Sequence, residues 1–199
     1  MSEPAPLVLA SVGPFSVSAF PNVPGLKVRP IDGEARFALR LRPENRAAAE
    51  RTLGAAIPEP VGATDRAGGC AVLCLGPDEW RIVVDPAEAP AIVAAFAAWS
   101  VPHALVDVSD REAVLELDGP LVEAVLAAGC PLDLSLDAFP VGRATRTLWG
   151  KAGVLVWRRG VEVIRLECGR SFALYLIGRL AVTVGEVDAL ARRAAASRG

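Results

Sequence analysis

The sequence predicts an α+β fold of two pseudo-repeated βαββα halves, with mainly antiparallel sheets that carry their helices on one face. Two observations support this prediction. The alternating segment RFALRL at residues 36–41 returns as EAVLEL at residues 112–117, each followed by a proline and later by a glycine. The two strand-like segments that close the first half also return, with the same spacing between them. Because each half leaves one sheet face uncovered, we expect the halves to pack together.

Residues 1–35 are predicted to form an N-terminal arm without regular structure. Six prolines and three glycines occur in this stretch, and both residue types favour turns and loops over helices and strands. We expect the arm to be ordered by lying across the body of the protein or across a partner.

The first half is predicted to span residues 36–102. Apolar and basic residues alternate over residues 36–41, as in a half-buried strand. Pro43 is expected to open a helix that runs to about Leu53, with Gly54 as its stop.

Two further strands are predicted at residues 70–75 and 80–84, around a Gly-Pro-Asp turn. Asp85 is a natural N-cap for the helix that follows. The helical spacing places three apolar residues on one face of this helix, namely Ile92, Phe96 and Trp99.

The second half is predicted to span residues 103–182, followed by a separate C-terminal helix within residues 183–199. Strands at residues 154–158 and 163–168 repeat the earlier pair, and a helix from Gly169 repeats the earlier helix. The repeat offset changes after Gly129, which indicates an insertion between Gly129 and Val154.

Composition excludes several classes of protein. The 21 basic and 23 acidic side chains give a net charge of −2, so a nucleic-acid partner is not expected. The longest apolar run, residues 89–99, is too short for a membrane span. The N-terminus lacks a basic region and makes a poor secretory signal. The four cysteines lie in apolar contexts and indicate a reduced, cytoplasmic location.

Catalytic, cofactor-binding and metal-binding residues are not expected on this chain. His103 is the only histidine, and Cys70 and Cys74 have no second pair to complete a zinc site. Ser171 lies one residue away from a nucleophile-elbow pattern but is better explained as a residue near a helix start. The chain also lacks the glycine-rich loops that hold nucleotides.

Asp107, Ser109 and Arg111 allow two interpretations. On an extended strand their side chains would share one face and would be able to contact a polar ligand. Alternatively they form a turn in which Asp and Ser accept local N–H groups, and Arg111 pairs with Asp107 or contacts a partner. The second interpretation, a structural or interface role, is favoured.

Aromatic residues and arginines are concentrated in the second half, as protein–protein hot spots often are. Trp149 and Trp157 flank a Gly-Lys-Ala-Gly turn. The opposing interpretation is that both tryptophans belong to the core and the arginines form a solvated face, and the sequence does not separate the two. Glu116, Asp133 and Asp137 are not expected to form a catalytic carboxylate pair, because the two aspartates lie in a proline-bounded loop.

Residues 106–158 carry an ordered set of motifs that resembles the gamma subunit family of heterotetrameric sarcosine oxidase. The motif and interface candidates are Asp107, Ser109, Arg111, Gly119, Pro120, Cys130, Pro131, Asp133, Phe139, Gly142, Thr147, Trp157 and Arg158. The βαββα duplication is also similar to the folate-binding aminomethyltransferase domain.

The resemblance implies a non-catalytic subunit that supports a sarcosine-oxidising complex. The larger subunits would carry FMN, FAD, NAD and tetrahydrofolate, and the isolated chain would have no activity. One alternative is a free-standing folate-binding or aminomethyltransferase-like protein. Another is the small subunit of a different N-methyl amino acid oxidase or demethylase.

Overall fold

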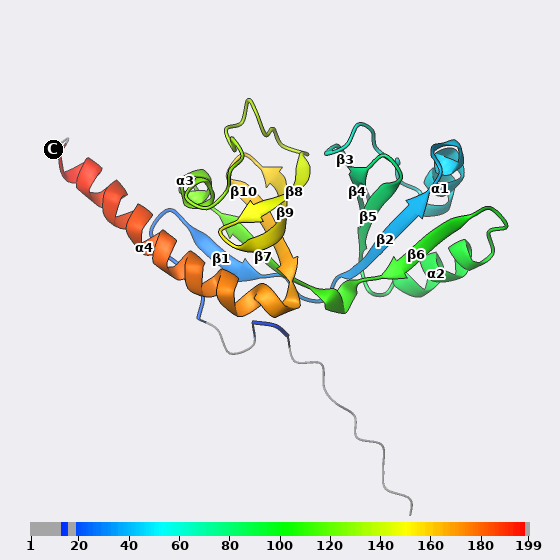
Figure 1. Ribbon diagram of the computed structural model, residues 1–199, viewed down its shortest axis with the longest axis horizontal. Helices are drawn as coiled ribbons and strands as arrows, with labels where there is room; N and C mark the ends of the chain where they lie inside the picture. The colour runs from blue at the N-terminus through cyan, green and yellow to red at the C-terminus, as the bar shows by residue number, and fades with distance from the viewer. Residues whose placement is uncertain (1–12, 16–18, 198–199) are drawn as a thin grey trace, which may run out of the picture.

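The computed structural model describes residues 13–15 and 19–197, which form two five-stranded sheets side by side (Figure 1). The first sheet has the order β3-β4-β5-β2-β6 and the second the order β8-β9-β10-β7-β1. Read in this way, each strand of one sheet has its counterpart at the same place in the other. The predicted duplication and the α+β fold class are therefore confirmed.

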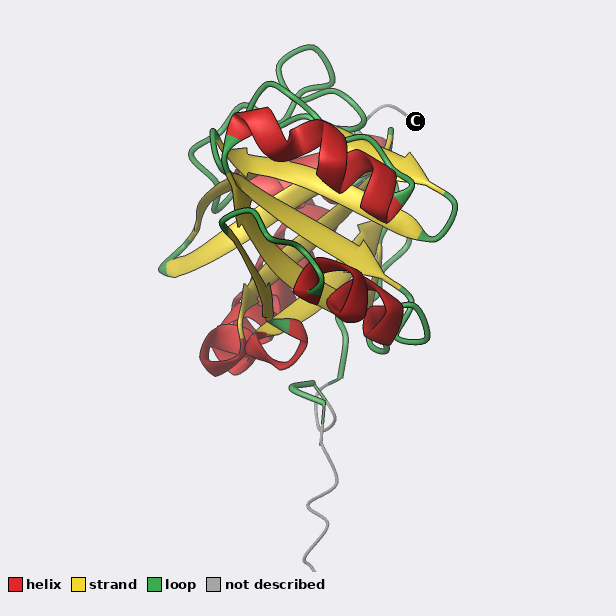
Figure 2. Cartoon of the chain, turned by 90° about the vertical axis from the view of Figure 1, so that its right-hand side faces the viewer, coloured by secondary structure: helices red, strands yellow, loops and turns green. Residues whose placement is uncertain are grey.

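The first sheet is antiparallel throughout. Two helices, α1 (Arg46–Leu53) and α2 (Ala89–Ala97), cover its outer face (Figure 2). Its strands are β2 (Ala35–Leu41), β3 (Thr64–Ala67), β4 (Cys70–Gly76), β5 (Glu79–Val84) and β6 (His103–Asp107).

The helices of the first half follow the sequence pattern closely. A 3₁₀ turn at Pro43–Asn45 leads into α1, which ends at Gly54 with a φ of 63°. Phe96 of α2 is buried, and Ile92 and Trp99 pack against the same core. However, α2 begins at Ala89, later than predicted, because the Asp85 carboxylate accepts the Ala87 N–H at 2.8 Å and forms a turn.

The second sheet is also antiparallel and packs its outer face on two helices, α3 (Val122–Ala127) and α4 (Ala173–Ala196). Its core includes Leu115, Leu126, Ile164 and Leu176. Its strands are β1 (Lys27–Pro30), β7 (Glu112–Asp118), β8 (Ala144–Trp149), β9 (Ala152–Gly160) and β10 (Val163–Gly169).

Four features differ from the sequence prediction. Each sheet has five strands, whereas each predicted half has three, because two further edge strands join it: β3 and β6 in the first sheet, and β8 and β1 in the second. The predicted boundary after residue 102 separates β6 from its sheet, since β6 pairs with β2. The helices predicted on either side of residue 182 form one helix, α4, whose buried stripe continues through Leu180 and Val184.

The fourth difference concerns the N-terminal arm. Within residues 1–35, β1 forms a regular strand that pairs with β7. Pro30 is tolerated there because β1 lies at the edge of its sheet. Phe15 and Leu26 are buried against the second core, so the described part of the arm lies across the body, as predicted. Residues 1–12 and 16–18 lie outside the described part.

Gly119→Ala is expected to lower the free energy of unfolding by more than about 2 kcal/mol. Gly119 has a φ of +136°, and a Cβ there would lie 2.3 Å from the Gly25 carbonyl oxygen. The control is Gly185→Ala in α4, where a Cβ meets nothing within 4 Å. This control should stabilise the helix by about 1 kcal/mol. Urea denaturation measures both, and equal effects of the two changes would contradict the close contact at Gly119.

Candidate functional site

The inner faces of the two sheets meet at the edge where β4 approaches β8. Thr64 Oγ1 donates to the Gly142 carbonyl at 2.7 Å, and the Ala144 N–H donates to the Gly62 carbonyl at 2.8 Å. A small apolar cluster fills part of the space behind this edge. Its buried members are Ala71, Leu73 and Val83 from the first sheet and Ala144, Leu155 and Trp157 from the second.

Beside this cluster lies a layer of charged side chains that joins the sheets, which we call the inter-sheet charge layer (Arg36, Arg81, Glu34, Glu112, Glu116, Arg159, Arg165 and Glu167). Arg81 of β5 is bound by Glu112 of β7 through both carboxylate oxygens, one of them at 3.0 Å. Its Nη1 also donates to Glu167 of β10 at 3.2 Å. Strand β5 is therefore tied to two strands of the other sheet.

Glu34 and Arg165 extend this layer toward the chain segment between β1 and β2. Arg165 Nη1 donates to Glu34 Oε1 at 3.0 Å, and Arg165 Nε lies 2.8 Å from Glu167 Oε1. Arg165 is 1% exposed and Glu167 is also 1% exposed, so these charges are removed from water. Buried charges persist only where they are paired, which explains why the layer alternates cations and anions.

The pKa values of three carboxyl groups in the layer are shifted in opposite directions. Burial raises the pKa of Glu167, and this effect outweighs the neighbouring charges of Arg165 and Arg81. Burial also acts to raise the pKa of Glu112, but its bonds to Arg81 lower it overall. Likewise, Arg165 outweighs burial and holds the pKa of Glu34 below its ordinary value. Opposite charges and desolvation are the physical causes.

Acid should destabilise the protein through Glu34 and Glu112. Because their folded pKa values lie below the unfolded value of about 4.3, their contribution is present above that pH and is lost as pH falls through the folded pKa. Glu167 acts in the opposite sense: its contribution is present below about pH 4.3 and is lost as pH rises through its raised pKa.

The Glu34→Gln variant is therefore expected to lose less free energy of unfolding than the unmodified chain as the pH falls below about 4.3. The measurement is the urea midpoint across an acid series, with Glu44→Gln as the control because the Glu44 side chain is 65% exposed. Identical acid profiles for Glu34→Gln and the unmodified chain would contradict this role of the Arg165–Glu34 pair.

Asp107, Ser109 and Arg111 form a turn between β6 and β7. Asp107 Oδ1 accepts hydrogen bonds from the Ser109 backbone N–H at 2.9 Å and from the Ser109 hydroxyl at 2.6 Å. The Ser109 hydroxyl oxygen also accepts the Arg36 backbone N–H at 2.9 Å. Arg111 pairs with Glu112 at 3.7 Å rather than with Asp107. The structure thus shows the turn geometry of the second interpretation.

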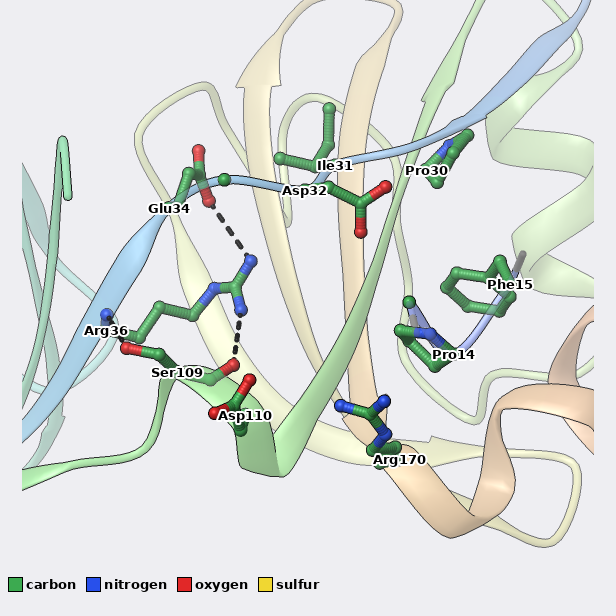
Figure 3. Close-up of a pocket in the computed structure, with 12 residues that line it drawn as sticks. Pro14, Phe15, Pro30, Ile31, Asp32, Glu34, Arg36, Ser109, Asp110 and Arg170 are labelled. Carbon is green, nitrogen blue, oxygen red and sulfur yellow. Dashed lines mark hydrogen bonds and ion pairs between the residues drawn. The ribbon is translucent and has the colours of Figure 1, made fainter. Parts of the chain in front are cut away.

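This turn borders a cavity of about 530 Å³ between the described arm and the β1–β2 segment (Figure 3). Arg36 lines this cavity, and its guanidinium donates to the Ser109 carbonyl at 3.1 Å and to the Glu34 carboxylate at 3.4 Å. Asp32 and Asp110 supply further carboxylates, and Phe15 forms an apolar wall. The bonds between Arg36 and Ser109 hold the turn to β2.

Arg158 holds the loop that follows α3 onto the second sheet. The side chain is 0% exposed, and its guanidinium donates to the carbonyl oxygens of Leu134 and Val161, the latter at 2.6 Å. Glu123 lies 3.6 Å away. Leu134 is buried, so Arg158 supplies a hydrogen bond that water cannot.

The remaining motif residues near this loop have structural positions. Asp133 accepts the Ser135 N–H at 2.9 Å, and this bond holds the pKa of Asp133 below its usual range. Cys130 and Phe139 are buried in the second core, and the Cys130 thiol lies 4.0 Å from the Thr147 hydroxyl. Pro131 is exposed at the start of the loop. Gly142 ends the loop in a turn with a φ of +86°.

Three other candidates lie in the sheets or beside them. Gly119 packs against Gly25, and Pro120 comes just before α3. Trp157 is 2% exposed and stacks under Arg159, whose guanidinium carbon lies 5.2 Å from the ring centre. Trp149 is also buried and donates to the Leu126 carbonyl at 3.0 Å. Both tryptophans are therefore core residues.

Sequence reasoning missed the inter-sheet charge layer. Its signal was nevertheless present, because Arg165 and Glu167 alternate with apolar residues in VIRLECG and must share one face of their strand. The same alternation is typical of a strand with one face in water, so the sequence does not show that this charged face is buried against a second sheet. No group of three or more metal-ligating residues occurs in the described part of the chain. None of the described helices is long and apolar enough to cross a membrane.

The architecture defines a two-sheet α+β protein of the class found in aminomethyltransferase T of the glycine cleavage system. The crystal structure of that protein from Bartonella henselae superposes with a TM-score of 0.59 at 16% identity, covering 78% of this chain and 45% of that one. Residues 40–185 match the model of the sarcosine oxidase, gamma subunit family. The chain belongs to this family.

Individual relatives agree with the family match. The sarcosine oxidase subunit gamma of Corynebacterium sp. (strain U-96) is 34% identical over 146 residues, which cover 72% of this chain and 70% of that protein. The Arthrobacter sp. subunit gamma is 39% identical, and the matched region spans only 58% of each protein. A chain in the structure of heterotetrameric sarcosine oxidase from Corynebacterium sp. U-96, in complex with pyrrole 2-carboxylate, has a TM-score of 0.82 at 29% identity. That match covers 89% of this chain and 96% of the other.

Proposed function

We propose that this chain is the non-catalytic gamma subunit of a heterotetrameric sarcosine oxidase. In this role it supports assembly of a complex that oxidises sarcosine to glycine, with formation of hydrogen peroxide and methylenetetrahydrofolate. The observation that carries the proposal is the match to a chain of the Corynebacterium complex over 96% of that chain. The larger subunits would hold FMN, FAD, NAD and tetrahydrofolate, and the complex would work in the cytoplasm.

The chemistry of the motif residues supports a structural role. Arg158 is committed to two backbone carbonyls, and Asp107 and Ser109 are committed to a turn. A catalytic acid or base must reach its substrate, whereas these groups already bind the chain itself. Their positions favour a subunit that keeps a precise shape.

The outer side of α4 supports a role in packing against other subunits. Exposed large apolar side chains on one element often mark an interaction surface. Three such side chains on α4 are more than half exposed, namely Leu174 at 64%, Val182 at 52% and Leu190 at 62%.

The proposal is tested by expressing the larger subunits with and without this chain. With the chain present, we expect one assembly that contains flavin and makes peroxide from sarcosine, measured by native mass and peroxide release. Without it, we expect the larger subunits to lose that assembly. An assembly of unchanged mass and activity in the absence of this chain would overturn the proposed role.

A further inference from the structure

A second cavity, of about 230 Å³, opens between the two sheets beside Trp157. The first sheet contributes the β3–β4 hairpin and the end of β5, and the second contributes β9 and β10. Part of its wall is apolar, because Ala71, Val83 and Trp157 line it and all belong to the buried cluster between the sheets. This wall suits the apolar part of a small molecule.

The cavity also carries two guanidinium groups from the second sheet. Arg159 and Arg165 lie over the Trp157 ring, at 5.2 and 5.7 Å from its centre. Arg165 is occupied by its bonds to Glu34. Arg159 uses Nη1 to bind Glu116 at 3.0 Å, but its Nε is buried and has no hydrogen-bond acceptor among the described residues. Arg159 therefore has donor capacity left.

Arg66, on β3, adds a third cation at the edge of this cavity. It is exposed, and its guanidinium has no hydrogen bond or ion pair within the part of the chain that the structure describes. The two carboxylates that line the cavity are already engaged, Glu34 with arginines and Asp85 with the Ala87 N–H. The lining thus has three cations against two anions.

The titration of Arg159 agrees with this excess of positive charge. Burial lowers the pKa of Arg159 and the charges of Arg66 and Arg165 lower it further, which together outweigh the opposing charges of Glu116 and Glu34. A negatively charged group between the two side chains would relieve their repulsion and would accept their unused donors.

We propose that this cavity binds a small organic anion, with its carboxylate or phosphate group held by Arg66 and Arg159 and its apolar part against Trp157. A site built in this way selects for charge and for an apolar body together. The proposal does not depend on the assembly function, because every group that carries it belongs to this chain.

The test is calorimetric titration of the full chain with four probes at low ionic strength, where charge contacts are least screened. Benzoate and phenyl phosphate carry an apolar ring, whereas acetate and inorganic phosphate carry the same charged groups without one. We expect saturable binding of at least one aromatic probe, at least about fivefold tighter than its partner without the ring. The aromatic probe that binds more tightly distinguishes a carboxylate ligand from a phosphate ligand.

Arg66→Ser should weaken that binding by about fivefold or more, because an exposed side chain is removed without disturbing the core. Arg42→Ser is the matched control, since Arg42 is 73% exposed and does not line this cavity. Arg159→Gln should weaken binding in the same direction. The proposal is overturned if no probe binds saturably, or if Arg66→Ser and Arg42→Ser change the affinity equally.

Discussion

Arg81→Met is expected to lower the free energy of unfolding by about 3–5 kcal/mol, the usual cost of removing one partner from a buried ion pair. Arg81 is 3% exposed and bonds both Glu112 and Glu167 from the opposite sheet. Without it, Glu112 loses both of its bonds to a buried cation, and the cation that remains beside it is the exposed Arg111 at 3.7 Å. The change should also loosen the packing of one sheet on the other.

Urea denaturation at neutral pH measures this loss, and Arg40→Met provides the control. Arg40 lies in the first sheet and pairs with Asp78 and Glu79, but its side chain is 56% exposed, so its removal should cost less than about 1 kcal/mol. The double variant Arg81→Met with Glu112→Gln should recover at least about 1 kcal/mol, because it removes the charge left unpaired. A loss no larger than that of Arg40→Met would show that the charge layer does not hold the sheets.

Arg158→Met is expected to cost about 3 kcal/mol, because two carbonyl oxygens lose a charged donor and at least the Leu134 carbonyl remains buried. The loop of residues 130–142 should then open, which amide hydrogen exchange at Leu134 and its neighbours would detect. Arg158→Lys should retain part of the stability, since an ammonium group carries the charge but lacks the planar fork.

The same substitution separates a structural role from a role in substrate choice. We expect Arg158→Met, like replacement of Trp157, to impair folding or assembly of the proposed complex. Arg42→Met, at an exposed position, should leave both unchanged. An intact complex of Arg158→Met with an altered substrate preference would contradict this assignment.

The fold was largely predictable because its internal repeat appears as periodic patterns of apolar residues within short segments of the sequence. The segments RFALRL and EAVLEL show their period of two directly, and both form interior strands, β2 and β7. Gly54 ends α1 as its position after the helix pattern predicts. Strand β3 (Thr64–Ala67) escaped prediction because a short polar edge strand lacks an apolar period.

The candidate site was less predictable, because its contacts join residues far apart in the chain. The turn at Asp107 and Ser109 is local, and sequence reasoning anticipated its geometry. The bond between Arg81 and Glu112 depends on how two sheets face one another, which no local pattern specifies. Arg158 was selected through the family resemblance, but its two carbonyl partners follow only from the folded loop.

The most direct test of the central claim, that this chain is an accessory subunit of a sarcosine-oxidising complex, is a tagged pull-down from cells that make it. The eluate would be measured for native mass, flavin absorbance and peroxide formation from sarcosine. Co-elution with larger flavin-containing subunits that oxidise sarcosine is the expected result. A colourless eluate that contains this chain alone would contradict the claim. The chain would then be titrated with folate, to test the alternative of a free-standing folate-binding protein.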